Sequence, residues 1–137
     1  MSNKDVSAVI VGMNILYEAE EQLRVPLRKL KLNINEWLVL KTLYLEYAGK
    51  PSEVAAYLNI QRASVTRHVD KLTKLKLLNR DYQRDDRRTV ELVVTNSGKK
   101  VCKDILAMYP SITNNIHERL NGTDKNLWLS MINAKRI

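Results

Sequence analysis

The amino-acid sequence predicts a mainly α-helical protein with one small β-hairpin. Apolar side chains recur at helical spacing along most of its 137 residues, a length that suits one domain or one compact core with an added helix. Residues 90–94 instead alternate between two faces, with the period of a half-buried strand. Before them stands QRDDRR, residues 83–88, in which five of six side chains are charged and cannot form a core. These charges therefore mark the exposed end of a hairpin.

The N-terminal third of the chain is expected to hold two helices. Apolar residues at a period of 3.6 indicate the first over about residues 6–23, and Pro26 should end or kink it. Asn33 can cap the second helix, and Glu36 three residues later completes a capping box. The buried side of this second helix should carry Trp37, Leu40 and Leu43, with Tyr44 and Tyr47.

Two further helices are expected in close succession. Gly49 should end the second helix, and Pro51 suits the first turn of a short third one. A turn at Asn59 and Ile60 then leads into a fourth helix. Its buried stripe should comprise Val65, Val69 and Leu72, with Leu75 or Leu77 at its end.

The hairpin and two C-terminal helices complete the expected order. The strands LLNRDYQ and TVELVVT flank the charged tip RDDRR. The residues TNSG, 95–98, can cap a long helix that runs to about Leu120. Gly122 and Thr123 should separate it from a last helix over about residues 124–134. Six helices and one hairpin result.

The net charge of +8 is concentrated in the middle of the chain. Lysines and arginines against aspartates and glutamates number 6 and 6 in residues 1–49, 12 and 6 in residues 50–100, and 5 and 3 in residues 101–137. A concentrated basic region suggests a polyanionic partner, and nucleic acid before membrane because no helix combines a basic face with a broad apolar one. A well-solvated surface is the alternative interpretation.

Several other protein classes are disfavoured by short sequence features. The apolar stretch at residues 6–13 is flanked by acids and is too short to span a bilayer, which favours a cytoplasmic protein. The single Cys102 excludes an intramolecular disulfide framework and a cysteine-rich zinc site. A buried, inert thiol is expected there, with a redox sensor as the alternative. His68 and His117 stand far apart, so we expect no metal and no cofactor. Catalytic motifs are also missing, and an enzyme is not expected.

Two helices joined by a tight turn and followed by a basic hairpin describe a winged helix-turn-helix, whose second helix enters the DNA major groove. Projection of the fourth helix places its apolar residues and His68 on one side. On the other side, Arg67 could bind guanine, and Thr66 and Ala63 could meet a thymine methyl group. Ser64 points more to the side, where it could reach a phosphate. The alternative is a solvated surface helix. The candidate DNA contacts of this helix are Arg62, Ala63, Ser64, Thr66, Arg67 and Lys71.

From about residue 33 to residue 98 the chain resembles the MarR/SlyA family of bacterial winged-helix transcription regulators. The resemblance is carried by Asp86-Arg87-Arg88 with the strand that ends in Val94-Thr95, by SVTRHVDKL, and by NEWLVLKTL. It implies that Arg88 enters the minor groove, where the negative potential favours a guanidinium. Arg84 and Arg87 would then lie near phosphates, and Asp86 would stabilise the wing by pairing with a neighbouring arginine.

Four positions depart from the family pattern. Lys50 and Gln61 stand where small capping residues are frequent, at the starts of the third and fourth helices. Asn59 and Lys76 stand where glycine is frequent, before and after the fourth helix. These residues are expected to stabilise the ends of the helices less well than the usual ones. They also make the base preference harder to transfer from relatives.

The resemblance also implies a homodimer. Residues 1–32 and 99–137 would form an intertwined helical dimerisation region, and residues 33–98 the DNA-binding domain. Packing of these helices within one chain is the alternative. The apolar residues expected at the dimer contact are Val9, Ile10, Leu16, Ile105, Leu106, Met108, Ile112, Ile116, Leu127, Trp128, Met131 and Ile132.

Relatives of this kind bind small aromatic or lipophilic effectors, which makes an effector a further expectation. Nothing in the sequence specifies its site. Tyr17, Trp37, Tyr44 and Met108 could line a cleft, although aromatic residues at helical spacing more often belong to a core. The expected function is sequence-specific binding of a pseudo-palindromic operator, with repression as the default outcome. A winged helix used for protein contacts, or for architectural DNA binding without sequence preference, is the alternative.

Overall fold

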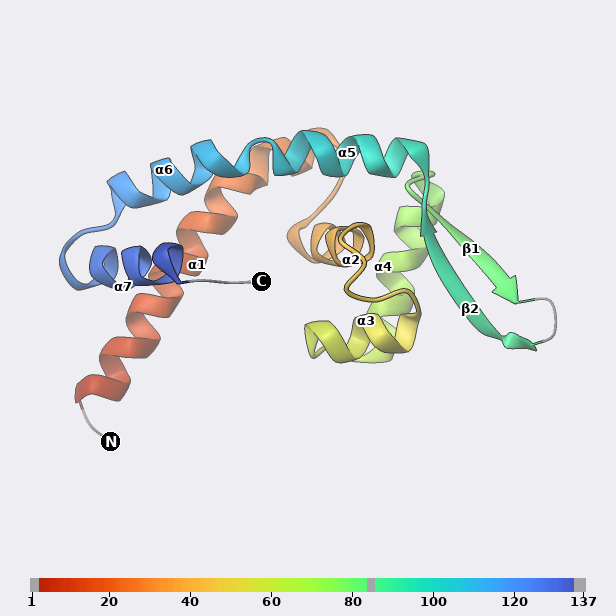
Figure 1. The fold of residues 1–137 in the computed structure, drawn as a ribbon, viewed down its shortest axis with the longest axis horizontal. Coiled ribbons are helices and arrows are strands. Elements are labelled where there is room, and N and C mark those ends of the chain that lie inside the picture. The colour runs from red at the N-terminus through yellow and green to blue at the C-terminus, as the bar shows by residue number, and fades with distance from the viewer. Residues whose placement is uncertain (1–2, 84–85, 135–137) are drawn as a thin grey trace. The chain divides into compact units, whose positions relative to one another are not determined.

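The computed structural model describes residues 3–83 and 86–134, and it confirms a mainly helical fold with one small hairpin (Figure 1). Contacts within the chain divide it into two compact units. The central unit is Leu27–Ala107, and the terminal unit combines Met1–Pro26 with Met108–Ile137. The elements are α1 (Asn3–Lys29), α2 (Ile34–Tyr44), α3 (Pro51–Leu58), α4 (Arg62–Lys74), β1 (Leu78–Gln83), β2 (Asp86–Val94), α5 (Asn96–Leu106), α6 (Tyr109–Arg119) and α7 (Gly122–Asn133).

The central unit packs α2, α3, α4 and α5 with the base of the hairpin around one apolar core. The predicted capping box starts α2: the Asn33 side chain accepts a hydrogen bond from the Glu36 amide at 2.9 Å, and the Glu36 carboxylate accepts one from the Asn33 amide at 2.8 Å. Trp37, Leu40 and Leu43 are buried on α2 as predicted, whereas Tyr44 is half-buried. The side chains with no exposed surface in this unit include Trp37, Val39, Leu40, Val54, Val65, Leu72 and Leu78.

The hairpin is antiparallel, and its base is built into the core. Leu78 pairs with Val94 and Asp81 with Glu91, and the register shifts between Tyr82 and Gln83. The alternation predicted for the second strand is confirmed, because Leu92 is buried while Val93 is 46% exposed. The Leu92 amide also donates to the Gly49 carbonyl at 2.8 Å, which fixes β2 to the loop before α3.

Both positions where the family pattern favours glycine adopt left-handed backbone. Asn59 has a φ of 55° at the end of α3, and Lys76 has a φ of 63° after α4. Asparagine tolerates this conformation, whereas for lysine it costs about 1 kcal/mol. The chain therefore keeps both turns without glycine.

The predicted ends of two helices were wrong. α1 continues through Pro26 to Lys29, with buried Leu23 and Leu27 on either side, so Pro26 does not end the helix. The alternative expectation, a kink at Pro26, stays a prediction. α2 ends at Tyr44, well before Gly49, because Glu46 takes a left-handed φ of 63° that terminates the helix. Tyr47 therefore lies beyond the helix and is 54% exposed instead of buried.

The predicted long helix from residue 96 to about Leu120 is interrupted. Thr95 caps α5 as expected, with its hydroxyl accepting from the Gly98 amide at 3.0 Å. The helix stops at residue 106, and α6 starts at Tyr109 with Pro110 in its first turn. Proline has no N–H for the Leu106 carbonyl and its ring clashes with that carbonyl, which favours the break between α5 and α6. The last predicted helix is present as α7, starting two residues early.

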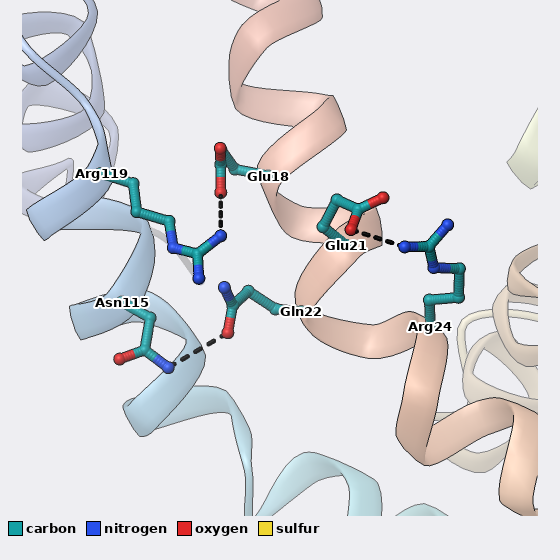
Figure 2. A network of polar contacts seen from close by, with 6 residues as sticks. All are labelled: Glu18, Glu21, Gln22, Arg24, Asn115 and Arg119. Carbon is teal, nitrogen blue, oxygen red and sulfur yellow. Dashed lines mark hydrogen bonds and ion pairs between the residues drawn. The ribbon is translucent and has the colours of Figure 1, made fainter.

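The terminal unit packs α1, α6 and α7 around a small core of Val11, Ile15, Ile116 and Leu120. Three polar pairs join α1 to the other two helices, at 3.0–3.4 Å. Figure 2 shows two of them, between α1 and α6, beside the ion pair of Glu21 and Arg24 within α1. The three pairs are Glu18 with Arg119, Gln22 with Asn115, and Asn14 with Asp124.

Much of the apolar surface of the terminal unit is not covered by this core. Val9, Ile10, Met13, Leu16 and Tyr17 of α1 are all more than half exposed. On α7, Leu127, Met131 and Ile132 are 41–53% exposed. Two residues expected at a dimer contact are instead buried within one chain, because Ile116 lies in the small core of this unit and Ile105 lies in the central unit. Among the described residues, no helix is both long and apolar enough to cross a bilayer.

Candidate nucleic-acid interface

The fourth helix presents one buried face and one exposed basic face. Val65, Val69 and Leu72 are at most 2% exposed, which confirms the predicted stripe, and His68 is half-buried at its edge. The opposite side exposes four of the six candidate contacts in the first turns of α4. These exposed residues are Arg62, Ala63, Thr66 and Arg67, and Ser64 beside them is half-buried.

The start of α4 leaves backbone donors for an external acceptor. Gln61 occupies the N-cap position, and within the described residues no side chain caps the helix. The amides of Ser64 and Val65 already bond to the Gln61 carbonyl, whereas Arg62 and Ala63 precede these first helical bonds. A helix N-terminus with basic side chains nearby is suited to hold a phosphate.

Two candidate contacts are held in place by their own helix. The Arg67 guanidinium donates to the Ser64 hydroxyl at 3.1 Å, and the Thr66 hydroxyl donates to the Arg62 carbonyl at 3.2 Å. The Ser64 hydroxyl thus restricts where the Arg67 side chain points before any ligand is present. An ordered arginine loses less rotamer freedom when it forms a bidentate contact.

Lys71, also expected to contact DNA, is engaged by another side chain of the protein. Its Nζ lies 3.0 Å from Oε1 of Glu36 on α2, and the Glu36 side chain is only 5% exposed. The Lys71 side chain itself is 45% exposed. The pair lies in the wall of a pocket of about 450 Å³ that runs along this flank of α4 and also touches Ser64, Arg67 and His68.

A second ion pair ties α4 to the hairpin. Arg80 of β1 donates to Asp70 of α4. The negative charge of Asp70, on the exposed side of α4, is therefore neutralised by a residue of the strand. Neither this pair nor the pair of Lys71 with Glu36 was foreseen from the sequence. Their partners are 10 and 35 residues apart, and no local motif marks either contact.

Three of the four predicted wing residues lie on a strand. β2 begins at Asp86, so Asp86, Arg87 and Arg88 extend the strand that was expected to start after them. The backbone of these three residues is described and their side chains are not, while Arg84 lies outside the described residues. The roles of all four therefore stay predictions.

The third helix replaces its missing cap with a glutamate. Glu53 accepts from the amides of Gly49 at 3.1 Å and Lys50 at 2.9 Å. These two backbone hydrogen bonds lower the pKa of the Glu53 carboxyl below its ordinary value. The signal was present in the sequence, because Glu53 stands three residues after Lys50, as in one half of a capping box.

The weak candidates for an effector site are scattered. Trp37 has no exposed surface, which makes it a core residue, and Tyr44 lines an open groove of about 920 Å³ in the central unit. Tyr17 lines a pocket of about 240 Å³ in the terminal unit. Met108 belongs to the same unit but not to this pocket, and it is 38% exposed.

Cys102 is buried, as predicted. Burial raises the pKa of its thiol to about 12, so the reactive thiolate is scarce at neutral pH. In the described part of the chain, no cluster of three or more histidine, cysteine, aspartate or glutamate side chains could hold a metal ion.

Known proteins share both sequence and fold with this chain. Residues 23–105 match the family model described as the transcriptional regulator SarA/Rot. The uncharacterized HTH-type transcriptional regulator YhbI of Bacillus subtilis is 25% identical over 77% of this chain and 70% of its own length. The transcriptional repressor MprA of Escherichia coli is 28% identical over 67% of this chain, which spans only about half, 54%, of MprA.

The chain is more similar to known proteins in its fold than in its sequence. A mutant MarR of Escherichia coli, solved in complex with operator DNA, superposes with a TM-score of 0.75 at 18% identity, covering 95% of this chain and 93% of that one. The predicted resemblance to MarR-type winged-helix regulators is thereby confirmed at the level of the fold.

Proposed function

Because the chain belongs to the SarA/Rot family of transcriptional regulators, we propose that it acts by binding double-stranded DNA through α4 and the hairpin. The observation that carries this proposal is the first half of α4, where exposed Arg62, Thr66 and Arg67 stand beside the uncapped helix start. A helix of this kind reads base edges with its N-terminal residues. The complex of MarR with operator DNA supports the same use of the shared fold.

Each contact has a physical role in this proposal. Arg67 takes guanine O6 and N7 as a bidentate pair, Thr66 and Ala63 meet a thymine methyl group, and Arg62 and Ser64 hold phosphates. These assignments agree with the exposure of each side chain along α4. Sequence choice would come mainly from Arg67, since phosphate contacts add affinity without base discrimination.

The wing adds contacts outside the major groove. Arg88 would enter the flanking minor groove, Arg84 and Arg87 would lie near phosphates, and Asp86 would hold the strand end by pairing with a neighbouring arginine. The fixed base of the hairpin supports this role, because the Leu92 to Gly49 hydrogen bond ties β2 to the central unit. A rigid base lets the extended strand carry arginines to a defined distance.

A homodimer is part of the proposal. The exposed apolar residues of α1 and α7 would be covered by a second copy, which gives residues 1–32 and 99–137 the dimerisation role and residues 33–98 the DNA-binding role. Two copies would occupy half-sites about one helical turn apart in a pseudo-palindromic operator.

Occupying that site would exclude polymerase and repress transcription, in the cytoplasm where the operator lies. The repressor MprA supports repression, and release by a small aromatic or lipophilic effector rests on the family resemblance.

The test is selection of binding sites from a random duplex library with purified protein, at about 150 mM salt, where specific and non-specific affinities separate well. Enrichment of an inverted repeat is expected. Retention of DNA without any enriched sequence would instead indicate a phosphate-driven, architectural protein. No retention at all would contradict DNA binding and favour a winged helix used for protein contacts.

A further inference from the structure

We propose that Lys71 is a positioning residue of the recognition helix α4 and not a DNA contact. Its ion pair with Glu36 sets the rotation of α4, and through that rotation the direction in which Arg67 meets a base. This inference rests on the proposed binding of DNA through α4. It assigns a specificity role to Glu36, a residue that is almost buried and cannot touch DNA itself.

The first argument is the environment of the Glu36 carboxylate. One oxygen, Oε1, accepts from Lys71 Nζ at 3.0 Å and from the Asn33 amide at 2.8 Å. A carboxylate that is 95% covered needs such partners, because an uncompensated buried charge is strongly unfavourable. If Lys71 turned away to a phosphate, Glu36 would lose its only ionic partner among the described residues. Lys71 is therefore held at Glu36.

The second argument is that α4 is fixed from two directions. Successive residues of an α-helix point about 100° apart. Asp70 pairs with Arg80 of β1, and its neighbour Lys71 pairs with Glu36 of α2. The two ion pairs thus connect adjacent positions of α4 to different elements of the central unit. A rotation of the helix about its axis would have to lengthen one pair or the other.

The third argument links the pair to recognition. Arg67 and Lys71 are four residues apart, so they lie on the same face in successive turns. Arg67 is also bonded to Ser64, one turn further toward the N-terminus. Displacement of the turn that carries Lys71 would therefore shift the turn that carries Arg67. A bidentate contact to guanine is sensitive to such a shift, whereas non-specific phosphate contacts tolerate it.

The test compares operator and scrambled duplexes over a salt series, using Lys71→Met and Glu36→Gln. Methionine keeps an apolar stem without the charge, and glutamine keeps an oxygen acceptor for the Asn33 amide. We expect Lys71→Met to lower the operator-to-scrambled affinity ratio at least about fivefold, the smaller end of one base contact, with an unchanged salt slope. Glu36→Gln should lower the ratio as well, while binding to scrambled DNA stays equal or rises because Lys71 is released.

A contact between Lys71 and a phosphate predicts the opposite pattern. Lys71→Met would then weaken both duplexes equally, and the slope of log affinity against log salt would fall by about 0.9 for each subunit. Glu36→Gln would leave the ratio unchanged. Either result would overturn the positioning role. Lys74→Met is the matched control, since it removes a charge from the same helix, and it should leave the affinity ratio unchanged.

The ion pair can be tested without DNA. Chemical unfolding of the parent, Lys71→Met, Glu36→Gln and the double variant forms a double-mutant cycle. We expect the double variant to lose less stability than the sum of the two single variants. Additive losses would show that Lys71 and Glu36 do not interact, and would leave the proposed DNA binding untouched. A parent protein that binds neither duplex would instead overturn the proposed function, and with it the role of the pair in recognition.

Discussion

The central and terminal units differ in how much of their apolar surface one chain buries. In the central unit the large apolar residues are mostly inside, and the exposed side of α4 is polar and basic. In the terminal unit a small core of Val11, Ile15, Ile116 and Leu120 holds α1, α6 and α7, while six large apolar side chains of α1 are more than half exposed. The central unit thus buries most of its large apolar side chains within one chain, whereas the terminal unit presents apolar surface that water does not favour.

This difference indicates a division of labour. Polar contacts such as Arg119 with Glu18 keep the terminal helices together within one chain. They leave the apolar face of α1 available for a second copy. In the central unit, charged residues serve internal positioning as well as the surface, as Lys71 and Asp70 show. The predictions below test this contrast, beginning with the unit that one chain leaves incomplete.

The largest effect is expected from charges on the apolar face of α1. In Ile10→Glu with Met13→Glu, two carboxylates replace side chains that are 52% and 64% exposed in one chain. If a second copy covers this face, burying those charges is prohibitive and the dimer dissociates. Operator affinity should then fall by about a hundredfold or more, because the second half-site no longer adds avidity.

Sedimentation and gel-shift titration measure these two outcomes. Ser7→Glu is the control, since it adds one such carboxylate to the same helix at a position that is already polar, and it should leave the dimer intact. A double variant that stays dimeric and binds operator normally would show that α1 does not form the contact.

The second prediction sharpens the role of the wing. Arg88→Ala removes the guanidinium proposed for the minor groove, and operator affinity should fall by about tenfold, equivalent to roughly 1.4 kcal/mol, with the dimer unchanged. Fluorescence anisotropy gives the affinity and sedimentation the assembly state. Arg24→Ala, which removes an arginine from α1, is the control. Equal binding by Arg88→Ala and the parent would contradict the wing role.

Features of the fold could be predicted from the sequence where the residues that cause them lie close together in the chain. The capping box of Asn33 and Glu36 and the buried stripe of α4 were predicted, because each is written within one helical element. The interruption before α6 was missed although Pro110 signals it in the sequence. That error was one of weighting, since a continuous apolar period outweighed a single proline.

Other features could not have been predicted because they arise when elements pack. A basic residue on a helix face has the same sequence pattern whether its partner is a phosphate or a carboxylate. Lys71 was therefore assigned to DNA, and only the packing of α2 against α4 reveals Glu36 beside it. The exposed apolar face of α1 is similar, because periodicity shows that α1 has apolar residues and not which of them one chain buries.

A third prediction concerns the stability of the central unit. Asn33→Ala removes the side chain that accepts from the Glu36 amide, and the free energy of unfolding should fall by about 1 kcal/mol. Asn35→Ala, an exposed neighbour within the same helix, should change it much less. Urea denaturation followed by circular dichroism measures both variants. Equal stability of Asn33→Ala and the parent would show that the Asn33 side-chain cap contributes nothing to stability.

A last effect is expected from Cys102, and it is absent at neutral pH and appears only at alkaline pH. Burial raises the pKa of its thiol from 9.0 to about 12, so folding favours the protonated form. The stability contributed by this group is fully present below pH 9 and is lost as the pH rises toward 12, because the unfolded chain releases the proton first. The parent should therefore lose stability relative to Cys102→Ala over this range, while the difference between them stays constant from about pH 6 to about 8. A difference that did not change above about pH 9 would mean that the thiol ionises as readily in the folded protein as in the unfolded chain. The central unit would then be more open to water at α5 than its buried contacts indicate.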